Sequence, residues 1–183
     1  MANQKSLGVR SPGQVYKMIS LPVAAGQTFV TGDFVLLVES GTIGLTIAAA
    51  AGNNFTAATT NSTRVVGRAT TPAVDSTLQT INAYASVIVA EDSVEFQAPL
   101  YSATPSSAVP TITQIGTSYG MRQVTGGYPA VNVDDTSAVF ARITDFDPND
   151  FAGWPAYSGA GSTQYANVWF KIIGASSLLA QGR

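Results

Sequence analysis

The chain has 183 residues, of which nine are basic and eleven acidic, so its formal net charge is −2. This length favours a single domain, and so weak a charge creates no field that would gather nucleic acid. The sequence contains no His and no Cys, which excludes His-based catalytic sites, disulfides and thiolate metal sites. The composition therefore favours a structural or binding protein over an enzyme, and no cofactor or metal is expected.

The apolar residues indicate β structure, because the chain holds 18 Val and only 9 Leu. Side chains branched at Cβ suit a pleated sheet, whereas Leu favours helices. No stretch is long and apolar enough for a membrane helix, so no membrane contact is expected. The N-terminus lacks the apolar segment of a secretory signal, which predicts synthesis in a cytoplasm.

Residues 1–17 are predicted to be an extended arm, separate from the body of the protein. The arm carries three basic residues and no acidic one, shows neither helical nor strand periodicity, and contains the turn signal Pro12-Gly13. We expect it to lie on a partner, with apolar side chains in shallow pockets and basic ones at the rim; the alternative is a frayed terminus. Its candidate interface residues are Lys5, Leu7, Val9, Arg10 and Lys17.

Residues 18–183 are predicted to form one β domain of short strands separated by turns. The candidate strands are 15–23, 34–38, 43–47, 64–69, 80–90, 94–98, 112–123, 130–133, 138–143 and 166–173. Segment 99–110 is expected to be a surface loop, because Pro cannot donate to a central ladder. This pattern predicts an all-β fold, either an antiparallel β-barrel or a jelly-roll-like sandwich with an extended N-terminal arm.

Two of these strands have the strongest apolar patterns and are expected to form the core. Residues 87–89 are continuously apolar, which predicts burial on both faces of a sheet. In the last strand, Val168, Phe170 and Ile172 alternate with polar or amphipathic residues, which predicts one buried face.

Three acidic clusters and one aromatic loop are the candidates for chemistry or binding. The carboxylates of 145–150 depart from the calcium-loop pattern, and Asp134-Asp135 are expected to be turn residues. Glu91, Asp92 and Glu95 keep a carboxylate hydrolase open as a rival, although solvated turns are the expectation. The loop 147–161 offers Trp154 and Tyr157 as a candidate binding surface, and the alternative is a loop that folds back on the core.

Several segments together resemble structural proteins of tailed bacteriophages. An apolar strand meets an acidic pair and then a Phe strand in ASVIVAEDSVEFQ, residues 85–97. Further similar segments follow in the same order: IGTSY at 115–119, VDDTSA at 133–138, the strand 139–143 with Asp-Pro at 147–148, and YANVWFKI at 165–172. The resemblance implies a capsid cement or decoration protein with a β-barrel or jelly-roll body, and it implies no catalytic residues.

The expected function is therefore that of a non-enzymatic protein on the outer capsid surface of a virion. Its expected partner is the major capsid protein, which it would brace as a homo-oligomer, a dimer or a trimer, without direct contact to nucleic acid. The alternative function is a phage receptor-binding or carbohydrate-binding module that uses the aromatic loop around Trp154 and Tyr157. The copy number in the virion distinguishes the two.

Overall fold

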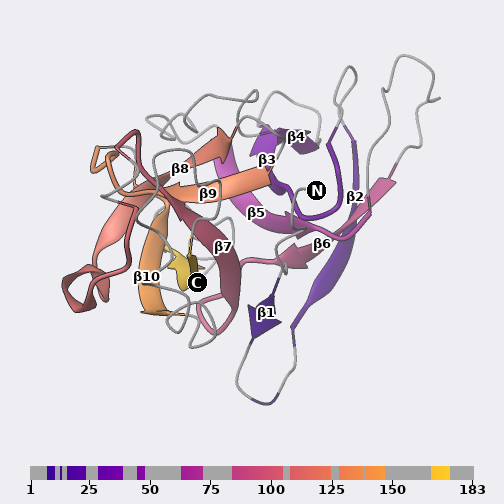
Figure 1. Cartoon of the computed structure of the whole chain (residues 1–183). Coiled ribbons are helices and arrows are strands. Elements are labelled where there is room, and N and C mark those ends of the chain that lie inside the picture. Colours follow the sequence, from indigo (N-terminus) through magenta and orange to yellow (C-terminus); the bar gives the residue numbers. More distant parts are fainter. Residues whose placement is uncertain are drawn as a thin grey trace, which may run out of the picture.

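The computed structural model describes residues 8–10, 13, 16–23, 29–38, 45–47, 63–71, 84–104, 108–124, 128–137, 139–146 and 166–173. These residues form eleven strands and one short 3-10 turn, and none of them belongs to an α-helix. The strands are arranged in two sheets, one on each side of the molecule (Figure 1). The predicted all-β fold is confirmed.

The first sheet closes on itself as a five-stranded barrel. Its strands are β7 (Glu95–Tyr101), β8 (Ser118–Val124), β9 (Tyr128–Asn132), β10 (Ala141–Phe146) and β11 (Asn167–Ile172). The order around the ring is β7–β11–β10–β8–β9, and these neighbours are antiparallel. A parallel pairing of Leu100 and Tyr101 in β7 with Val131 and Asn132 in β9 completes the ring. A further short strand, β1 (Val9–Arg10), pairs with the outer edge of β7.

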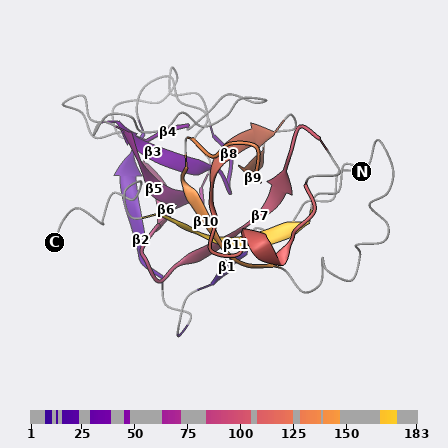
Figure 2. The ribbon, with the colours of Figure 1, turned by 90° about the vertical axis from the view of Figure 1, so that its left-hand side faces the viewer.

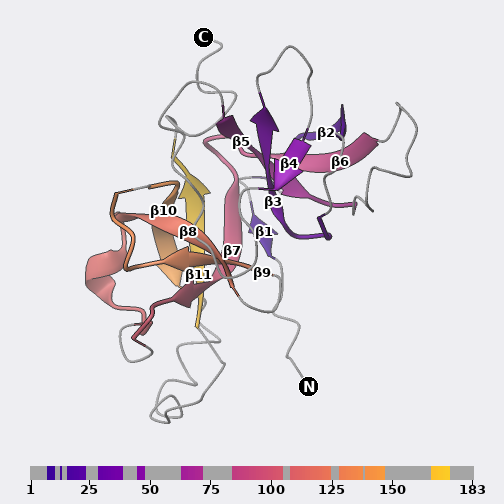
Figure 3. The same ribbon diagram turned by 90° about the horizontal axis from the view of Figure 1, so that it is seen from above.

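The second sheet has five antiparallel strands and lies against the barrel (Figures 2 and 3). Its strands are β2 (Met18–Pro22), β3 (Phe34–Val38), β4 (Leu45–Ile47), β5 (Thr63–Ala69) and β6 (Tyr84–Val89), in the order β2–β6–β5–β3–β4. β6 leads into β7 through a tight turn in which the amide of Val94 donates to the carbonyl of Glu91 at 2.9 Å. This turn joins the two sheets along the chain.

The prediction of a surface loop over residues 99–110 is wrong at its start, because strand β7 extends to Tyr101. Pro99 lies inside the strand opposite Asn167, and Leu100 is fully buried. Before Pro99, the amide of Gln97 donates to the carbonyl of Gly8, just before β1; after it, the carbonyl of Tyr101 accepts from the amide of Val133, just beyond β9. The missing N–H of Pro99 therefore falls where β7 changes its neighbour from β1 to β9, and no ladder bond is lost.

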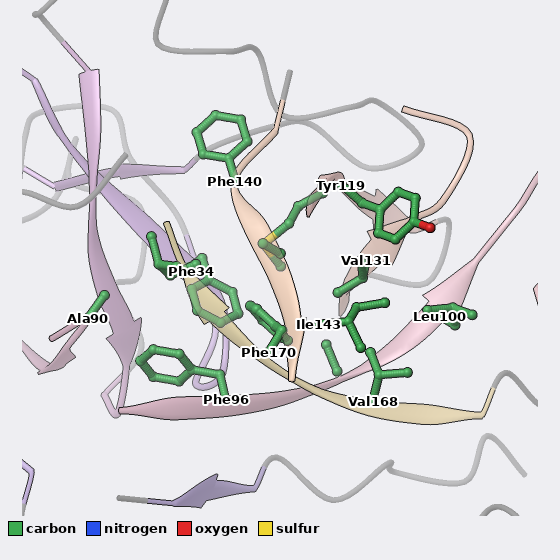
Figure 4. Packing of buried hydrophobic residues seen from close by; sticks show 14 of the residues in the cluster. Phe34, Ala90, Phe96, Leu100, Tyr119, Val131, Phe140, Ile143, Val168 and Phe170 are labelled. Carbon is green, nitrogen blue, oxygen red and sulfur yellow. The ribbon is translucent and has the colours of Figure 1, made fainter. Parts of the chain in front are cut away.

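The main core is built from side chains of all five barrel strands together with Phe34 and Ile88 of the second sheet. Phe34 of β3 enters it and packs edge-on against Phe96, with ring centroids 5.1 Å apart, and also contacts Phe170 at 5.7 Å (Figure 4). The expected core residues of the last strand, Val168, Phe170 and Ile172, are all buried there. Three rings from three strands thus fasten the second sheet to the barrel.

A smaller apolar cluster lies on the other face of the second sheet. Val87 and Ala85 of β6 belong to it together with Val35 of β3, whereas Ile88 faces the main core. Because successive side chains of a strand point to opposite faces, β6 contributes to two clusters at once. The predicted burial of residues 87–89 on both faces is confirmed.

Candidate partner-binding surfaces

The structure describes three of the seven residues that the sequence predicts to contact a partner. Val9 and Arg10 form β1 on the barrel, and Lys17 directly precedes β2 on the second sheet. The described part of the predicted arm therefore contacts two different sheets. The other four residues, Lys5, Leu7, Trp154 and Tyr157, lie outside the described segments.

Strand β1 is bound to β7 of the same chain. Val9 stands opposite Phe96 and Arg10 opposite Glu95 in an antiparallel register. The side chain of Val9 is partly buried and packs against the main core. For these two residues, the contact that the sequence analysis expects with a partner is thus made within the chain.

Gly8 approaches the barrel so closely that no side chain fits at this position. Its N–H donates to Oε1 of Gln97 at 3.2 Å, and its carbonyl accepts from the amide of Gln97 at 2.9 Å. A Cβ at Gly8 would lie 2.7 Å from Oε1 of Gln97 and 2.7 Å from Cη2 of Trp169. These distances are far below ordinary contact, so a side chain at this position would force the side chains of Gln97 and Trp169 to move.

Arg10 lies at the centre of a charged and aromatic cluster on the outside of the barrel. Its Nε donates to Oε2 of Glu95, and both terminal nitrogens lie 3.3 Å from Oδ2 of Asp145. Its guanidinium carbon stands 4.4 Å from the ring centroid of Trp169, and Nζ of Lys171 is 3.9 Å from the second oxygen of Glu95. The Arg10 side chain is 39% exposed, so each ion pair contributes only about 0.2–1 kcal/mol. Their combined effect is to fix where β1 docks.

Arg68 of β5 binds the carbonyl of Gly8, just before β1, and lies where the two sheets meet. Its side chain is almost completely buried; Nε donates to the carbonyl of Gly32 at 3.0 Å and one terminal nitrogen donates to the carbonyl of Gly8 at 3.1 Å. Its other terminal nitrogen has no hydrogen-bond partner among the described residues. Burial lowers the pKa of Arg68 to about 10, and the charge of Asp33 opposes this shift.

Asp33 is the second buried charged group of this junction. Its Oδ2 accepts from the amide of Val30 at 3.0 Å, and its Oδ1 accepts from Nε2 of Gln123 in β8 at 3.1 Å. Burial raises the pKa of Asp33, and the two hydrogen bonds and the charge of Arg68 counteract this rise. The junction is thus a polar network that links β3, β5, β8 and the segment before β1.

The outer edge of the second sheet carries exposed apolar and aromatic side chains. Tyr16 is 41% exposed, Met18 53% and Tyr84 59%. Lys17 lies between the first two, and its carbonyl accepts from the amide of Val89 at 2.9 Å. β2 pairs with β6 on one side, and no described strand pairs with its other side. We call Tyr16, Lys17 and Met18 the β2 edge; Tyr84 belongs to the neighbouring strand β6.

The sequence analysis named Lys17 as an interface residue of the predicted arm and did not name Tyr16 or Met18. Tyr16 and Met18 are two residues apart, which places them on the same side of an extended chain. Tyr84 lies at the other end of the β2–β6 pair, opposite Pro22, whereas Met18 stands opposite Ile88. The relation of Tyr16 to Met18 is visible in the sequence as a spacing, whereas the position of Tyr84 depends on a strand register that local pattern does not give.

A second exposed apolar feature lies on the 3-10 turn between β7 and β8. Ile112 is 79% exposed and Ile115 is 39% exposed. The turn is nevertheless well anchored: the amide of Gly116 donates to the carbonyl of Ile143 at 2.8 Å, and Oε1 of Gln114 accepts from the amide of Thr111 at 2.8 Å. The sequence signal for this turn is Thr-x-x-Gln at 111–114, which is typical of a helix start.

The acidic clusters serve local structure where the structure describes them. The carboxylate of Asp134 accepts from the hydroxyl of Ser102 at 2.8 Å, and that of Asp135 accepts from the amide and hydroxyl of Ser137 at 3.0 Å. Glu95 is bound by Arg10. Among the residues that the structure describes, no three His, Cys, Asp or Glu side chains lie together in a way that could hold a metal ion.

Comparison of the chain with models of protein families, with curated proteins and with solved structures finds no match. In the described segments no helix has the length and hydropathy needed to span a membrane.

Proposed function

We propose that this protein is a non-enzymatic structural protein of a tailed-bacteriophage virion. In this proposal it is a cement protein that binds the outside of the icosahedral head and braces neighbouring major capsid subunits. It acts there as a dimer or trimer, in many copies. The similarity of residues 85–97 and the later segments to phage structural proteins supplies the virion context.

The observation that carries the proposal is the β2 edge. An edge strand offers backbone N–H and C=O groups to a neighbouring chain, and proteins usually protect such edges with charges or short length. Here Met18 is more than half exposed and Tyr16 is 41% exposed, and the one charge among the three residues of this edge is that of Lys17. Aromatic residues and Met are enriched in protein interfaces, so this edge has the composition of a docking surface.

The body behind this edge is suited to a bracing role. The rings of Phe34, Phe96 and Phe170 and the hydrogen bond between Asp33 and Gln123 hold the second sheet against the barrel. A rigid body loses little conformational entropy on binding, so more of the interface energy remains as affinity. The same rigidity lets a load on one sheet pass to the other.

Head stabilisation then follows from mass action. A protein that binds the assembled lattice and not its dissociated subunits stabilises the lattice by RT ln(1 + [L]/Kd), about 2.7 kcal/mol per site at a hundredfold excess over Kd. Copies placed at symmetry axes repeat this contribution over the whole shell. An enzyme is not needed for the task.

The test is binding to purified empty heads, measured as copies bound per head with increasing protein concentration. We expect saturation at hundreds of copies per head, which is the copy number of a cement protein. The substitution Met18→Asp should weaken binding by on the order of 10–100-fold, because it places a charge in the centre of the contact. A few dozen copies or fewer would favour a spike or fibre module instead.

Val30→Asp provides a matched control for this substitution. Val30 is also 53% exposed, and it precedes β3, which β6 and β5 separate from β2 in the sheet order. Both variants should keep the melting temperature of the unmodified protein within a few degrees, because both side chains are on the surface. Equal binding by the two variants would exclude the β2 edge as the docking surface.

A further inference from the structure

The segment Gly8–Arg10 is recognised residue by residue by the outer edge of β7. Gly8 fits because Gln97 and Trp169 leave no room for a Cβ. Val9 packs against the main core. Arg10 is held by Glu95, by Asp145 and by the face of Trp169. The edge is thus an acceptor site that selects the order glycine, apolar residue, arginine in an added strand.

We infer that this acceptor site joins copies of the chain: the arm of one copy docks on β7 of its neighbour and makes there the contacts that it makes within its own chain. This exchange of arms goes beyond the proposed function and does not depend on capsid binding. The occupant of the site is segment 8–10 of a second copy. Docking by strand addition in this manner combines backbone bonds for affinity with side-chain pockets for specificity.

The energetics favour exchange when copies are crowded. Docking within the chain and docking between chains make the same contacts. The two states therefore differ mainly in the path of the chain between β1 and β2 and in the concentration of the competing arm. A short tether holds the arm at an effective concentration of roughly millimolar. At low concentration the arm therefore covers its own β7 edge and protects it from wrong pairing. When neighbouring copies reach a local concentration comparable to this effective concentration, their arms compete for the same site.

The connection between β1 and β2 contains Gly13, at which the backbone can change direction. Gly13 has a φ of +74° and is exposed, and no atom of the described residues lies within 4 Å of the position of a Cβ. A change of backbone direction at Gly13 breaks no side-chain packing there. The contacts with the barrel are made by residues 8–10, so these contacts travel with that segment and the adjustment falls on the connection.

The test uses the absence of cysteine from the chain, which gives disulfide trapping a clean background. Full-length Arg10→Cys carrying a mass tag is mixed with untagged full-length Glu95→Cys, since these two positions are paired in the register. After mild oxidation at a series of concentrations, we expect a mixed covalent dimer that increases toward the millimolar range. It should exceed, by on the order of tenfold at high concentration, the dimer from Arg10→Cys mixed with Asp92→Cys, an exposed acidic position in the turn before β7.

Two further measurements keep the inference falsifiable if these variants fold poorly. In the unmodified protein, mixed isotope-labelled chains should show magnetisation transfer between the Val9 methyls of one chain and the Phe96 ring of the other. Introducing Gly8→Ala into both trapping partners should abolish the excess of mixed dimer, because docking itself is blocked. The double variant Arg10→Cys/Glu95→Cys carries both cysteines in one chain and reports docking within that chain. If it cross-links only within single chains at every concentration, while the mixed single variants give no covalent dimer and no magnetisation transfer between chains is seen, the arm is a fixed part of its own barrel.

Discussion

The side chain of Gln123 donates a hydrogen bond of 3.1 Å to Oδ1 of Asp33, across ninety residues of sequence. Gln123 belongs to strand β8 of the barrel, and Asp33 directly precedes β3 of the second sheet. Both side chains are buried, 5% and 4% exposed, so water cannot replace the bond if it is lost. The two sheets are thus connected by a polar contact, this hydrogen bond, and by an apolar contact, the rings of Phe34, Phe96 and Phe170.

Replacing Gln123 by Ala should lower the free energy of unfolding by about 1–3 kcal/mol, because Oδ1 of the buried Asp33 then loses its donor. Urea unfolding monitored by Trp fluorescence measures the change. Thr113→Ala, at an exposed position of the 3-10 turn, is the control and should change stability by less than about 0.5 kcal/mol. Equal stability of the two variants would show that the cross-sheet bond contributes nothing.

The pH dependence of stability should report the burial of Asp33. Burial raises the pKa of this carboxyl above its ordinary 3.8, so the folded protein holds the proton more tightly than the unfolded chain. The stability that this proton provides is complete below pH 3.8 and is lost as the pH rises through the raised pKa. Asp33→Asn removes this dependence, so the stability difference between the unmodified protein and the variant should become smaller as the pH rises.

Melting curves from pH 3 to 9 test this expectation. Side chains with ordinary pKa values do not titrate between pH 6 and 9, since the chain has no His or Cys. The pKa of Arg68, about 10, lies above the range, and the cost of its buried charge is relieved only as the pH rises from about 10 towards 12.5. A stability difference that stays constant from pH 3 to 9 would contradict the role given to Asp33.

Phe170→Ala should cost about 3–5 kcal/mol, because the ring is completely buried between Phe34 and Phe96. Phe170→Leu should cost clearly less, since it fills most of the cavity. Denaturant unfolding of both variants gives the two values. If the Ala variant loses less than about 1 kcal/mol, the rings do not form the principal contact between the sheets.

The core could be predicted from sequence because its pattern is local. Alternation in the last strand placed Phe170 inward, and the apolar run 87–89 indicated burial on both faces; both expectations are confirmed. The partners of these residues could not be predicted in the same way. Phe34 reaches Phe96 only because the second sheet folds onto the barrel, and that contact depends on topology rather than on a local period.

Pro99 shows where a local rule fails. The rule excludes Pro from a central ladder because it has no N–H, and the sequence prediction of a loop followed from it. In the structure the strand β7 changes neighbours at this residue, so the N–H is not needed. The position of such a change depends on where β1 and β9 end, which a single sequence does not contain.

The sequence predicted some of the residues of the candidate surfaces, but not which side chains lie next to one another there. The basic arm and its Lys17 were visible as charge without compensation, whereas the docking of Arg10 depends on Glu95, Asp145 and Trp169 from three strands. Tyr84 and Met18 are both exposed and belong to paired strands, but the register places them at opposite ends of the pair. Long-range pairing, not residue type, determines which side chains share a surface.

Gly67→Ala should be among the most destabilising substitutions in the chain. A Cβ at this position would lie 1.9 Å from the carbonyl oxygen of Ile88, and the backbone has a φ of +156°. Gly67 stands at the irregular pairing of β3 with β5, and a backbone atom cannot move aside as a side chain can. We expect loss of folding, or a cost above about 4 kcal/mol, measured by circular dichroism and denaturant unfolding.

Gly116→Ala separates this clash from simple backbone strain. Gly116 has a φ of +83°, and no atom lies within 4 Å of its Cβ position. Its replacement should therefore cost only about 1–2 kcal/mol, the penalty of a left-handed residue with a side chain. Similar costs for the two variants would mean that β5 can move away from Ile88 and that the close approach is not required.

Gly8→Ala should detach β1 from the barrel while the barrel itself stays folded. The added methyl group would overlap with Gln97 and with the ring of Trp169, and relief of the clash requires either movement of both side chains or release of the segment. Release removes the acceptor of the Gln97 amide, which now donates to the carbonyl of Gly8 at 2.9 Å. Hydrogen exchange at this amide should therefore accelerate, by about tenfold for each 1.4 kcal/mol of lost docking energy.

The amide of Phe140 serves as the internal reference for this measurement. It donates to the carbonyl of Tyr119 at 2.9 Å within the barrel, away from β1, and its exchange rate should be unchanged in Gly8→Ala. Acceleration of both amides to the same degree would indicate global destabilisation. An unchanged rate at Gln97 would show that the segment keeps its place with a methyl group present, and the requirement for glycine in the acceptor site would be wrong.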